Sequence, residues 1–461
     1  MKRVKIRGGV GVGNMPVFGT AGARGVFNST QTPSQVYQLV ETAVFVFGKG
    51  RYGVGWDGRK SSLVLGRVVA SAIAAGGSEA VSFGLVPTPV LAYGTRENRC
   101  TLGFSVTASH NPPEFSGLKV FNANGMELSR DEEARIERGM MVSSIKTSAN
   151  IGRMSRVGAL QQYVTTMLSR FSRAERGSRI VVDCANGPGA FVTPEILRGL
   201  GNDVVTLNSH VSWRFSARAP EPTADTLRET SAFVANVKAD FGLAHDGDGD
   251  RLVLINSGGR VLPDYVTSIL VLEALGTSSG TVVLSENTSF AVEETAERLG
   301  MKVVRTRIGK TFADIEKEGA VLATEPSKIV DPRWGMWEDG IYCAALIADV
   351  INKRPDLRAV LDSELDWKFK QLNLPVSVDM SRIAAFSDEY FAKFRIAEKR
   401  SVDGLRIVFK DKSWVMFRPS GTEPKTRVYC ESRDELRLTE LIDAARGLVE
   451  RSVTKPILMG R

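Results

Sequence analysis

The stretch "RIVVDCANGPG" (179–189), followed by "EILRGLGNDVVTLN" (195–208), carries the pattern that decides the fold. An apolar strand rich in Val and Ile ends in an acidic residue, a helix-like segment follows, a glycine closes it, and a second apolar strand begins. A glycine after a helix and continuously apolar strands are typical of βαβ units with buried, mostly parallel sheets. The stretch therefore predicts an α/β domain.

The same pattern occurs at two other places in the chain. "YGVGWDGRKSS" (52–62) is followed by "VVASAIAAGGSEAVSFG" (68–84), and "GTVVLSENTSF" (280–290) by "AVEETAERLGMKVVRTRIG" (291–309). The acidic positions of the three copies are Asp57, Asp183 and Glu286. Because ligands of such sheets bind beyond the carboxyl ends of the strands, we expect the loops at these ends to face a common cleft.

The C-terminal part has a different pattern. "LRIVFKDKSWVMFRPSGTEPKTRVYCES" (405–432) alternates like antiparallel strands, and a helical segment follows at 434–453. The predicted fold is three similar α/β domains with mixed, mostly parallel sheets and a C-terminal α+β domain, with boundaries at 1–150, 151–254, 255–370 and 371–461.

Composition indicates a globular protein and excludes several classes. Of 461 residues, 43% are hydrophobic and 24% charged. The chain contains no apolar run of 18 residues, which is about the length needed to span a bilayer. Glycines and charges interrupt the place of a signal-peptide core near the start, so we expect a cytoplasmic protein without a membrane partner. The four cysteines form no CxxC pair, which argues against a zinc site or a disulfide framework.

The positive charge does not by itself indicate nucleic acid. The net charge is +8 and the pI about 9.3, but the Lys and Arg residues are dispersed, without a basic run or interleaved aromatic residues. Small anionic substrates explain this charge equally well.

The first candidate for chemistry is "TASHNPP" (107–113). A strand-like segment leads to Ser109, and the two prolines restrict the backbone after it. A hydroxyl is a weak nucleophile unless a base takes its proton or it carries a transferable group, and His110 and Lys119 are nearby candidates for proton transfer. A G-x-S-x-G elbow is excluded by Thr107 and Asn111. A hydrogen-bonded turn remains the structural alternative.

The second candidate, "DGDGDR" (246–251), lies between two apolar strands. Asp246, Asp248 and Asp250 would repel one another without a cation. The spacing excludes an EF-hand, and three carboxylates suit Mg²⁺ completed by a phosphate oxygen. Arg251 offers an anion partner, and a solvated acidic turn is the alternative.

Two further stretches have the chemistry of sugar-phosphate recognition. Arg418, Ser420, Gly421 and Thr422, with Arg427 beyond them, offer a guanidinium, hydroxyls and turn amides suited to phosphate, although a plain β-turn would look similar. Glu325 and Ser327 could bind vicinal sugar hydroxyls. No Walker motif accompanies them.

Together these motifs resemble the α-D-phosphohexomutase family, which includes phosphoglucomutase, phosphomannomutase and phosphoglucosamine mutase. The similarity covers essentially the whole chain. The segment 214–223 is similar to the interdomain segment of archaeal-type members. The stretches that carry it, in chain order, are "FGTAGARG" (18–25), "WDGRKSS" (56–62), "TASHNPP", "GLK" (117–119), "DGDGDR", "EPS" (325–327) and "RPSGTEP" (418–424).

The resemblance implies a heart-shaped enzyme of four domains that interconverts hexose 1-phosphate and hexose 6-phosphate. Glucose or mannose is the implied sugar, with glucosamine as a further candidate. Ser109 would be a phosphoserine, and a hexose 1,6-bisphosphate would be both intermediate and activator. Mg²⁺ would be held by Asp246, Asp248, Asp250 and the Ser109 phosphate.

The same resemblance assigns roles to the other residues. Lys119, Arg24 and His110 would serve proton transfer, and Arg251 would contact the substrate. Glu325 and Ser327 would bind the sugar; Arg418, Ser420, Gly421, Thr422 and Arg427 would hold the phosphate that is not reacting. A monomer or homodimer acting on a small phosphosugar is expected.

The third domain departs from the family pattern. Ser327 is followed by Lys328 and Ile329 where Gly and His are usual, and Lys310 stands where Asp is common. These lysines add positive charge near the substrate and leave the sugar preference open. A sugar-phosphate-binding relative, with little turnover because of the altered sugar loop, is therefore the alternative to a mutase. A Mg²⁺-dependent phosphatase is a separate third possibility.

Overall fold

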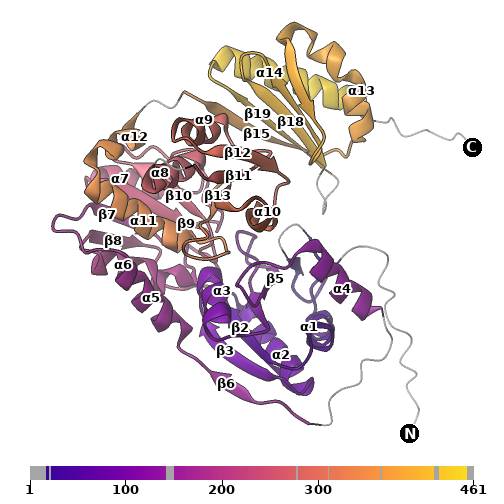
Figure 1. The fold of residues 1–461 in the computed structure, drawn as a ribbon, viewed down its shortest axis with the longest axis vertical. Helices are drawn as coiled ribbons and strands as arrows, with labels where there is room; N and C mark the ends of the chain where they lie inside the picture. Colours follow the sequence, from indigo (N-terminus) through magenta and orange to yellow (C-terminus); the bar gives the residue numbers. More distant parts are fainter. Residues whose placement is uncertain are drawn as a thin grey trace, which may run out of the picture.

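The computed structural model describes residues 17–19, 22–141, 150–276, 279–309, 311–363, 366–419 and 425–453. They form four sheets, which we assign to domain I (β1 to β6), domain II (β7 to β10), domain III (β11 to β14) and domain IV (β15 to β19). In Figure 1 the domains follow an arc, from domain I at the lower right, through domains II and III, to domain IV at the top. The predicted four-domain fold is confirmed.

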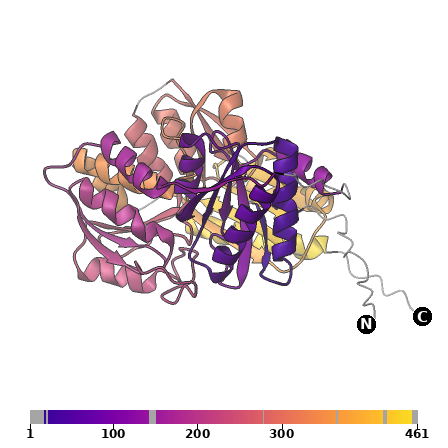
Figure 2. The same cartoon turned by 90° about the horizontal axis from the view of Figure 1, so that it is seen from below.

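Domain I is a six-stranded sheet between two layers of helices (Figure 2). Helices α1, α2 and α4 share one apolar core with the sheet, and α3 packs on the other side together with α5. The sheet order is β1-β5-β4-β2-β3-β6. The elements are β1 (Ala23–Val26), α1 (Pro33–Phe47), β2 (Arg51–Trp56), α2 (Lys60–Ala75), β3 (Glu79–Leu85), α3 (Thr88–Glu97), β4 (Leu102–Val106), β5 (Phe115–Asn122), α4 (Arg130–Met140) and β6 (Met154–Arg156).

Domains II and III repeat the central part of this sheet. The orders β8-β7-β9-β10 and β12-β11-β13-β14 match β3-β2-β4-β5, and in each case the first three strands are parallel and the fourth is antiparallel. Domain II contains α5 (Ala159–Arg170), β7 (Arg179–Asp183), α6 (Thr193–Gly199), β8 (Asp203–Leu207), α7 (Arg228–Asn236), β9 (Phe241–His245) and β10 (Leu252–Asn256). Domain III contains α8 (Tyr265–Leu275), β11 (Thr281–Ser285), α9 (Phe290–Arg298), β12 (Lys302–Thr306), α10 (Thr311–Glu318), β13 (Ala320–Glu325), β14 (Lys328–Val330), α11 (Gly340–Lys353) and α12 (Arg358–Asp362).

Two of the expected boundaries divide these sheets. The boundary at 254/255 cuts through β10, whose residues pair with β9 over its whole length, so the second sheet continues to Asn256. The boundary at 150/151 separates β6 from domain I, although β6 pairs with β3. A short edge strand and the end of a hairpin have no sequence signal that marks the change of domain.

Domain IV is an antiparallel sheet covered by two helices, as the alternating pattern predicted. The strand order is β15-β19-β18-β17-β16, and every neighbouring pair is antiparallel. The elements are β15 (Lys368–Leu374), α13 (Met380–Tyr390), β16 (Ile396–Arg400), β17 (Leu405–Phe409), β18 (Trp414–Pro419), β19 (Thr426–Ser432) and α14 (Glu435–Ser452). Its core is separate, whereas one apolar cluster continues from α3 of domain I through domains II and III.

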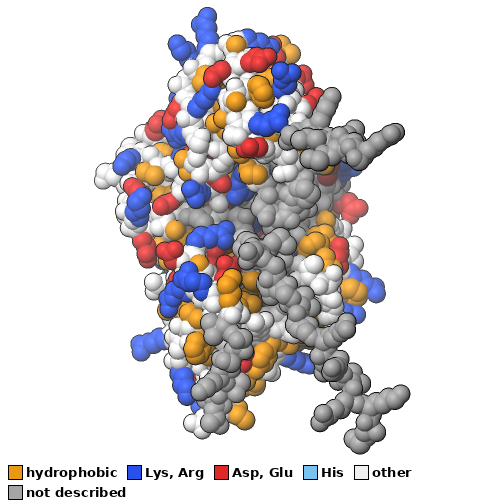
Figure 3. All heavy atoms as spheres, turned by 90° about the vertical axis from the view of Figure 1, so that its right-hand side faces the viewer, with side chains coloured by type: hydrophobic (Ala, Val, Ile, Leu, Met, Phe, Trp, Pro, Cys, Tyr) orange, Lys and Arg blue, Asp and Glu red, His pale blue; other side chains and the backbone are white. Residues whose placement is uncertain are grey.

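Surface and cysteines agree with the composition. On the face drawn in Figure 3, basic and acidic side chains are interspersed. Cys100, Cys184, Cys343 and Cys430 are buried and unbridged. Among the described residues, no helix is both long and apolar enough to cross a membrane.

Candidate active site

Three of the four motif loops occupy the same place in their domains. The serine loop (107–114) joins β4 to β5, the aspartate loop (246–251) joins β9 to β10, and the sugar loop (326–327) joins β13 to β14. Each thus follows a parallel strand at its carboxyl end, where ligands of such sheets bind. The loops touch one another: the Ser109 hydroxyl donates to Asp246 Oδ2 at 2.8 Å, and the Leu252 amide donates to the Ser327 carbonyl at 3.2 Å.

Ser109 lies in a strained backbone conformation. Its φ is 50°, in the left-handed region that non-glycine residues seldom adopt. The side chain is buried, and its amide donates to Thr107 Oγ1 at 2.8 Å. Such strain persists only where the surroundings hold the residue, and it occurs often at functional sites.

Arg59 supplies this support, although it is not among the candidate residues predicted from the sequence. Its Nη2 donates to the carbonyls of Ser109 (2.8 Å) and Asn111 (2.6 Å), and its Nη1 donates to two further carbonyls of residues 112–115. Asp57 Oδ2 accepts from Arg59 Nε at 3.1 Å and from Thr107 Oγ1 at 2.8 Å. The signal was present in "WDGR" (56–59): an acid and a base two residues apart, directly after a buried strand.

His110 lies beside Ser109 as an uncharged ring. Its Nδ1 is 3.3 Å from Ser109 Oγ. The positive charge of Arg251, together with burial and the charge of Arg24, lowers the pKa of His110 strongly. The ring can therefore exchange hydrogen bonds with Ser109 but carries no charge near neutral pH.

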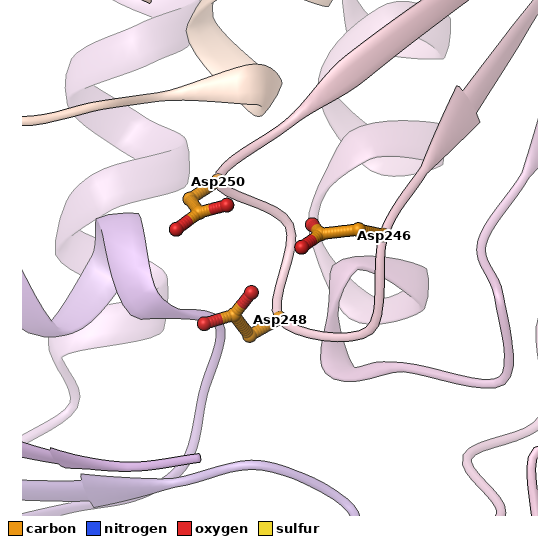
Figure 4. A group of neighbouring side chains, drawn as sticks. All are labelled: Asp246, Asp248 and Asp250. Atoms are coloured by element: carbon orange, nitrogen blue, oxygen red, sulfur yellow. The ribbon is translucent and has the colours of Figure 1, made fainter. Parts of the chain in front are cut away.

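The aspartate loop brings three buried carboxylates together (Figure 4). One oxygen each of Asp246, Asp248 and Asp250 lies within 4.8 Å of the others. Oδ1 of Asp248 and Oδ1 of Asp250 are buried and accept no hydrogen bond from any residue that the structure describes, which is costly unless a cation is their partner. Three hard oxygens with lone pairs left over fit a divalent ion such as Mg²⁺.

The electrostatics of the aspartate loop are uneven. Burial, followed by the charges of Asp250 and Asp248, raises the pKa of Asp246 well above its usual range. Burial also acts to raise the pKa of Asp250, but Lys119, Lys328 and Arg251 outweigh it and lower that pKa. A carboxyl group that resists ionisation beside an ionised one indicates a site with more negative charge than the nearby cations neutralise.

Lys119 is the buried cation of the site. Its Nζ contacts Asp250, lies 3.3 Å from Asp248 Oδ2 and is 4.0 Å from Glu127 Oε1. Burial alone would lower the pKa of Lys119, but Asp248, Asp250 and Glu127 outweigh it and raise that pKa. In this arrangement Lys119 holds its proton.

Two arginines expected at the site lie on either side of the loops. Arg24, on β1, donates to Asn111 Oδ1 at 3.0 Å, and Arg251 Nε lies 4.0 Å from Asp250 Oδ1. The Nε atoms of both arginines are buried and have no hydrogen-bond partner among the described residues. Donors left free beside carboxylate and serine loops are suited to an anionic group.

The sugar loop is a tight hairpin turn whose Ser327 has φ 60°. Glu325 Oε1 accepts from the Gly309 amide at 2.8 Å and from Thr311 Oγ1 at 3.1 Å. Glu325 and Lys328 are directly opposite each other in the β13–β14 pair, so their side chains project from the same face.

Lys328 extends from this face toward the aspartate loop. Its Nζ is bonded to Glu338 and lies 3.8 Å from Asp250 Oδ2. The expected extra positive charge is therefore shared with two carboxylates, one of which, Glu338, the sequence analysis did not identify. Lys310 lies outside the described residues.

The phosphate-binding motif is described in part. Arg418 and Arg427 are opposite each other where β18 and β19 pair, and two like charges in this position repel unless an anion lies near them. Arg418 Nε lies 2.9 Å from Asp403 Oδ2, beside a hollow of about 580 Å³ between domain IV and Arg130 of domain I. Ser420, Gly421 and Thr422 lie outside the described residues.

Family models of the domains of phosphoglucomutase/phosphomannomutase match this chain in order. Alpha/beta/alpha domain I matches residues 15–144, domain II residues 161–259, domain III residues 263–366 and the C-terminal domain residues 376–448.

Relatives and solved structures are similar over nearly the same length. The phosphopentomutase of Thermococcus kodakarensis is 33% identical over 449 residues, 95% of this chain and 99% of the relative. The probable phosphoglucosamine mutase of Thermococcus gammatolerans is 32% identical, with coverage of 95% and 99%. A crystal structure of a phosphoglucomutase/phosphomannomutase family protein from Burkholderia thailandensis, 23% identical, has the same fold, with a TM-score of 0.84 over 95% of this chain and 97% of that one.

Proposed function

Because this chain belongs to the phosphoglucomutase/phosphomannomutase family, we propose that it is a mutase that interconverts the 1-phosphate and 6-phosphate of a hexose through Ser109. The observation that carries this proposal is the contact between the serine and aspartate loops: a buried hydroxyl with a strained backbone lies 2.8 Å from one of three clustered carboxylates. A structural turn has no need of this arrangement.

The proposed reaction consists of two phosphoryl transfers, one from Ser109 to the sugar and one from the sugar back to Ser109. The phosphoryl group of phosphorylated Ser109 passes to the free hydroxyl of a hexose monophosphate. The bond from phosphorus to the serine oxygen breaks and that oxygen takes up a proton. A bond from phosphorus to the sugar oxygen forms, and the sugar hydroxyl gives its proton to a basic group; the second transfer reverses these proton movements. The resulting hexose 1,6-bisphosphate turns in the site and returns its other phosphoryl group to Ser109, so the same compound added from outside would activate unphosphorylated enzyme.

The residues around Ser109 have distinct proposed roles. Asp246, Asp248 and Asp250 would hold Mg²⁺ together with the serine phosphate, and this ion would supply positive charge to the transferred group. Arg24 and Arg251 would face the phosphoryl oxygens with their free Nε atoms. Lys119, with His110 as a neutral partner, would handle the sugar proton. Since Lys119 is protonated beside Asp250, it would give a proton to the oxygen from which phosphorus departs, which is the serine oxygen in the first transfer and the sugar oxygen in the second.

The remaining predicted residues would bind the rest of the substrate. Glu325 and Ser327 would accept and donate to sugar hydroxyls at the hairpin turn. Arg418 and Arg427, with Ser420, Gly421 and Thr422 between them in the chain, would hold the phosphate that does not react; such an anion would remove the repulsion between the opposed guanidinium groups.

A pentose phosphate is the second candidate substrate. The observation that favours it is Lys328, whose long side chain lies on the same face as Glu325 and reaches the aspartate loop. This side chain takes space beside the sugar-binding carboxylate, and the Thermococcus kodakarensis relative carries the name phosphopentomutase. Glucosamine phosphate is named for the second relative and belongs in the same comparison.

A ³¹P NMR time course tests the proposal. Glucose, mannose and glucosamine 1-phosphates and ribose 1-phosphate are offered separately, with Mg²⁺ and a trace of the matching bisphosphate. We expect conversion to the 6-phosphate, or to the 5-phosphate for ribose, and we expect Ser109→Ala to lower turnover by about 10³-fold or more, since it removes the group that carries the phosphoryl.

The matched control is Ser116→Ala. Ser116 is a buried serine at the start of β5 whose hydroxyl has no hydrogen-bond partner in the described part of the chain, so its loss should leave turnover nearly unchanged. If Ser109→Ala keeps a tenth of wild-type turnover, Ser109 is not the phosphoryl carrier. Release of inorganic phosphate in place of an isomer would indicate a phosphatase, and binding without conversion a sugar-phosphate-binding protein.

A further inference from the structure

Asp403 joins two domains through a single oxygen atom. It lies in the turn between β16 and β17 of domain IV. Its Oδ2 accepts from the Ile308 amide of domain III at 3.1 Å and pairs with Nε of Arg418 at 2.9 Å. The side chains of Asp403 and Arg418 are 18% and 13% exposed, so this contact is largely shielded from solvent.

Ile308 lies in the loop between β12 and α10, and the next amide of this loop donates a hydrogen bond to the sugar hairpin. Gly309 N donates to Oε1 of Glu325 at 2.8 Å, one residue after the amide that Asp403 accepts. Gly309 has φ 82°, a conformation that glycine adopts without strain. Two successive amides thus connect Glu325, at the sugar hairpin, with Asp403, which pairs with Arg418.

The side chain of Ile308 fixes the same loop on domain IV. It packs against a cluster of the domain IV sheet formed by Val408, Trp414, Met416 and Tyr429. The end of the loop therefore contacts domain IV through both its backbone and its side chain. A displacement of the loop would move the hydrogen bond to Glu325 and the hydrogen bond to Asp403 together.

We infer that Asp403 is a positioning residue that couples phosphate binding at Arg418 to sugar binding at Glu325. This inference rests on the proposed function, which makes these two residues substrate contacts. Arg418 stands opposite Arg427, so its guanidinium needs a counter-charge to keep one orientation before phosphate binds. Asp403 supplies that charge, and through Ile308 and Gly309 it makes the orientation depend on the sugar hairpin. Sugar and phosphate of one substrate are then recognised cooperatively.

Binding measurements on three variants test the coupling. Dissociation constants of inorganic phosphate and of glucose 1-phosphate are measured by calorimetry without Mg²⁺, so that turnover plays no part. For Asp403→Asn we expect phosphate to bind about tenfold more weakly, and the preference for glucose 1-phosphate over phosphate to shrink, because the neutral amide keeps an acceptor for Ile308 but loses the charge. Asp403→Glu retains the carboxylate and should recover part of both effects.

Asp411→Asn is the matched control. Asp411 lies in the next turn of the same sheet and pairs with Nε of Arg437 at 2.9 Å, the same distance as in the Asp403 pair, but wholly within domain IV. It should change neither constant. With a mutase assay added, Asp403→Asn should raise KM about tenfold and change kcat less than threefold.

The outcomes separate this inference from the proposed function. If phosphate affinity and the preference for glucose 1-phosphate are unchanged in Asp403→Asn, the coupling does not exist, whatever the turnover. If Asp403→Asn fails to fold, Asp403→Glu decides: a variant with the carboxylate one methylene displaced and yet no change in either constant overturns the inference. If the phosphate affinity depends on Asp403 as expected but the wild-type protein converts no sugar, the proposed function alone is overturned.

Discussion

At the scale of single residues, Arg59 is the side chain on which the serine loop depends. One guanidinium reaches four carbonyls of the loop, so a residue with fewer fixed donors cannot replace it. We expect Arg59→Lys to leave some of these carbonyls unpaired, at about 1–3 kcal/mol each, and to lower kcat about 10²-fold through misplacement of Ser109.

Arg51→Lys is the comparison for this prediction. Arg51 begins β2, the strand that Arg59 follows, and donates to a single carbonyl from a more exposed position. It should cost little in urea unfolding and leave kcat unchanged. Arg59→Lys with kcat within threefold of wild type would show that the loop keeps its conformation without the guanidinium.

Substitution of one of the three aspartates should have opposite effects on the stability of the metal-free protein and on metal binding. Asp246→Asn removes one charge from a crowded set, and the amide oxygen can still accept from the Gly249 amide. We expect the metal-free variant to unfold at the same or a higher temperature than wild type. The wild type should gain stability on addition of Mg²⁺, by about 2.7 kcal/mol at 100 times Kd, and the variant should lose this response.

Asp183→Asn separates this effect from general loss of a buried charge. Asp183 is as buried as Asp246 but pairs with Arg218 at 2.9 Å. The variant should be destabilised, because an arginine is left unpaired, and should still respond to Mg²⁺. A Mg²⁺ response in Asp246→Asn equal to that of wild type would remove Asp246 from the ligand set.

The sequence points to the residues that we propose to react more readily than to the residues that contact and support them. Ser109 and the three aspartates lie within short motifs whose chemistry is local. Glu338 and Asp403 contact Lys328 and Arg418, which are 10 and 15 residues away, and their partners follow from how strands and turns pair. A pattern of residue types carries no information about which turn of one domain faces which loop of another.

At the scale of elements, the three α/β domains use equivalent strands for equivalent purposes. The motif loop follows the equivalent strands β4, β9 and β13, and a buried acid follows or ends the equivalent strands β2, β7 and β11. Each acid pairs with a buried arginine: Asp57 with Arg59, Asp183 with Arg218, and Glu286 with Arg406. The recurring strand, acid and helix were visible in the sequence, but the arginines lie at unrelated positions and only the first is near enough to be found.

The ion pair between Lys328 of the β13–β14 hairpin and Glu338 should contribute to stability. Lys328 and Glu338 are each 12% exposed, so neither is well solvated without the other. Lys328→Met should cost about 3–5 kcal/mol in urea unfolding, because it leaves Glu338 and Asp250 without this cation.

A double substitution tests the cause of that loss. Lys328→Met combined with Glu338→Gln removes both charges of the pair and should recover most of the stability. If the two substitutions are additive, Lys328 and Glu338 act independently, and the loss in Lys328→Met comes from packing.

At the scale of the whole molecule, domains I to III are joined more firmly than domain IV. The Asp339 carboxylate of domain III accepts from the hydroxyl of Tyr163 in α5 and from the indoles of Trp334 and Trp337, and Tyr93 of α3 stacks on Trp334 at 5.7 Å. One aromatic cluster therefore joins three domains. Domain IV has its own main core and meets domain III through one small apolar cluster and through charged and polar contacts, so we expect it to be the part that can move.

Arg406 is a buried contact between domain IV and domain III, and we expect the position of domain IV to depend on it. It is 2% exposed, donates to Glu286 Oε2 of domain III at 3.3 Å, and lies 4.5 Å from the ring of Trp414 and 5.1 Å from that of Phe290. Arg406→Met leaves Glu286 buried without its cation, which should cost about 3–5 kcal/mol and release domain IV. The radius of gyration in small-angle scattering should then rise, and KM should rise because Arg418 moves with the domain.

Two further variants decide whether charge or packing holds domain IV in place. Glu286→Gln with Arg406→Met should restore the wild-type radius, since neither charge is left buried alone. Lys412→Met removes a half-exposed ion pair with Glu294 at 3.1 Å between the same domains and should change stability by less than about 1 kcal/mol. If Lys412→Met releases domain IV as fully as Arg406→Met does, the domain is held by the sum of its surface charges, and the buried pair has no special part. If the double variant stays expanded, the stacking of the guanidinium on Trp414 and Phe290 holds domain IV, and Arg406 acts as a flat side chain between two rings more than as the partner of Glu286.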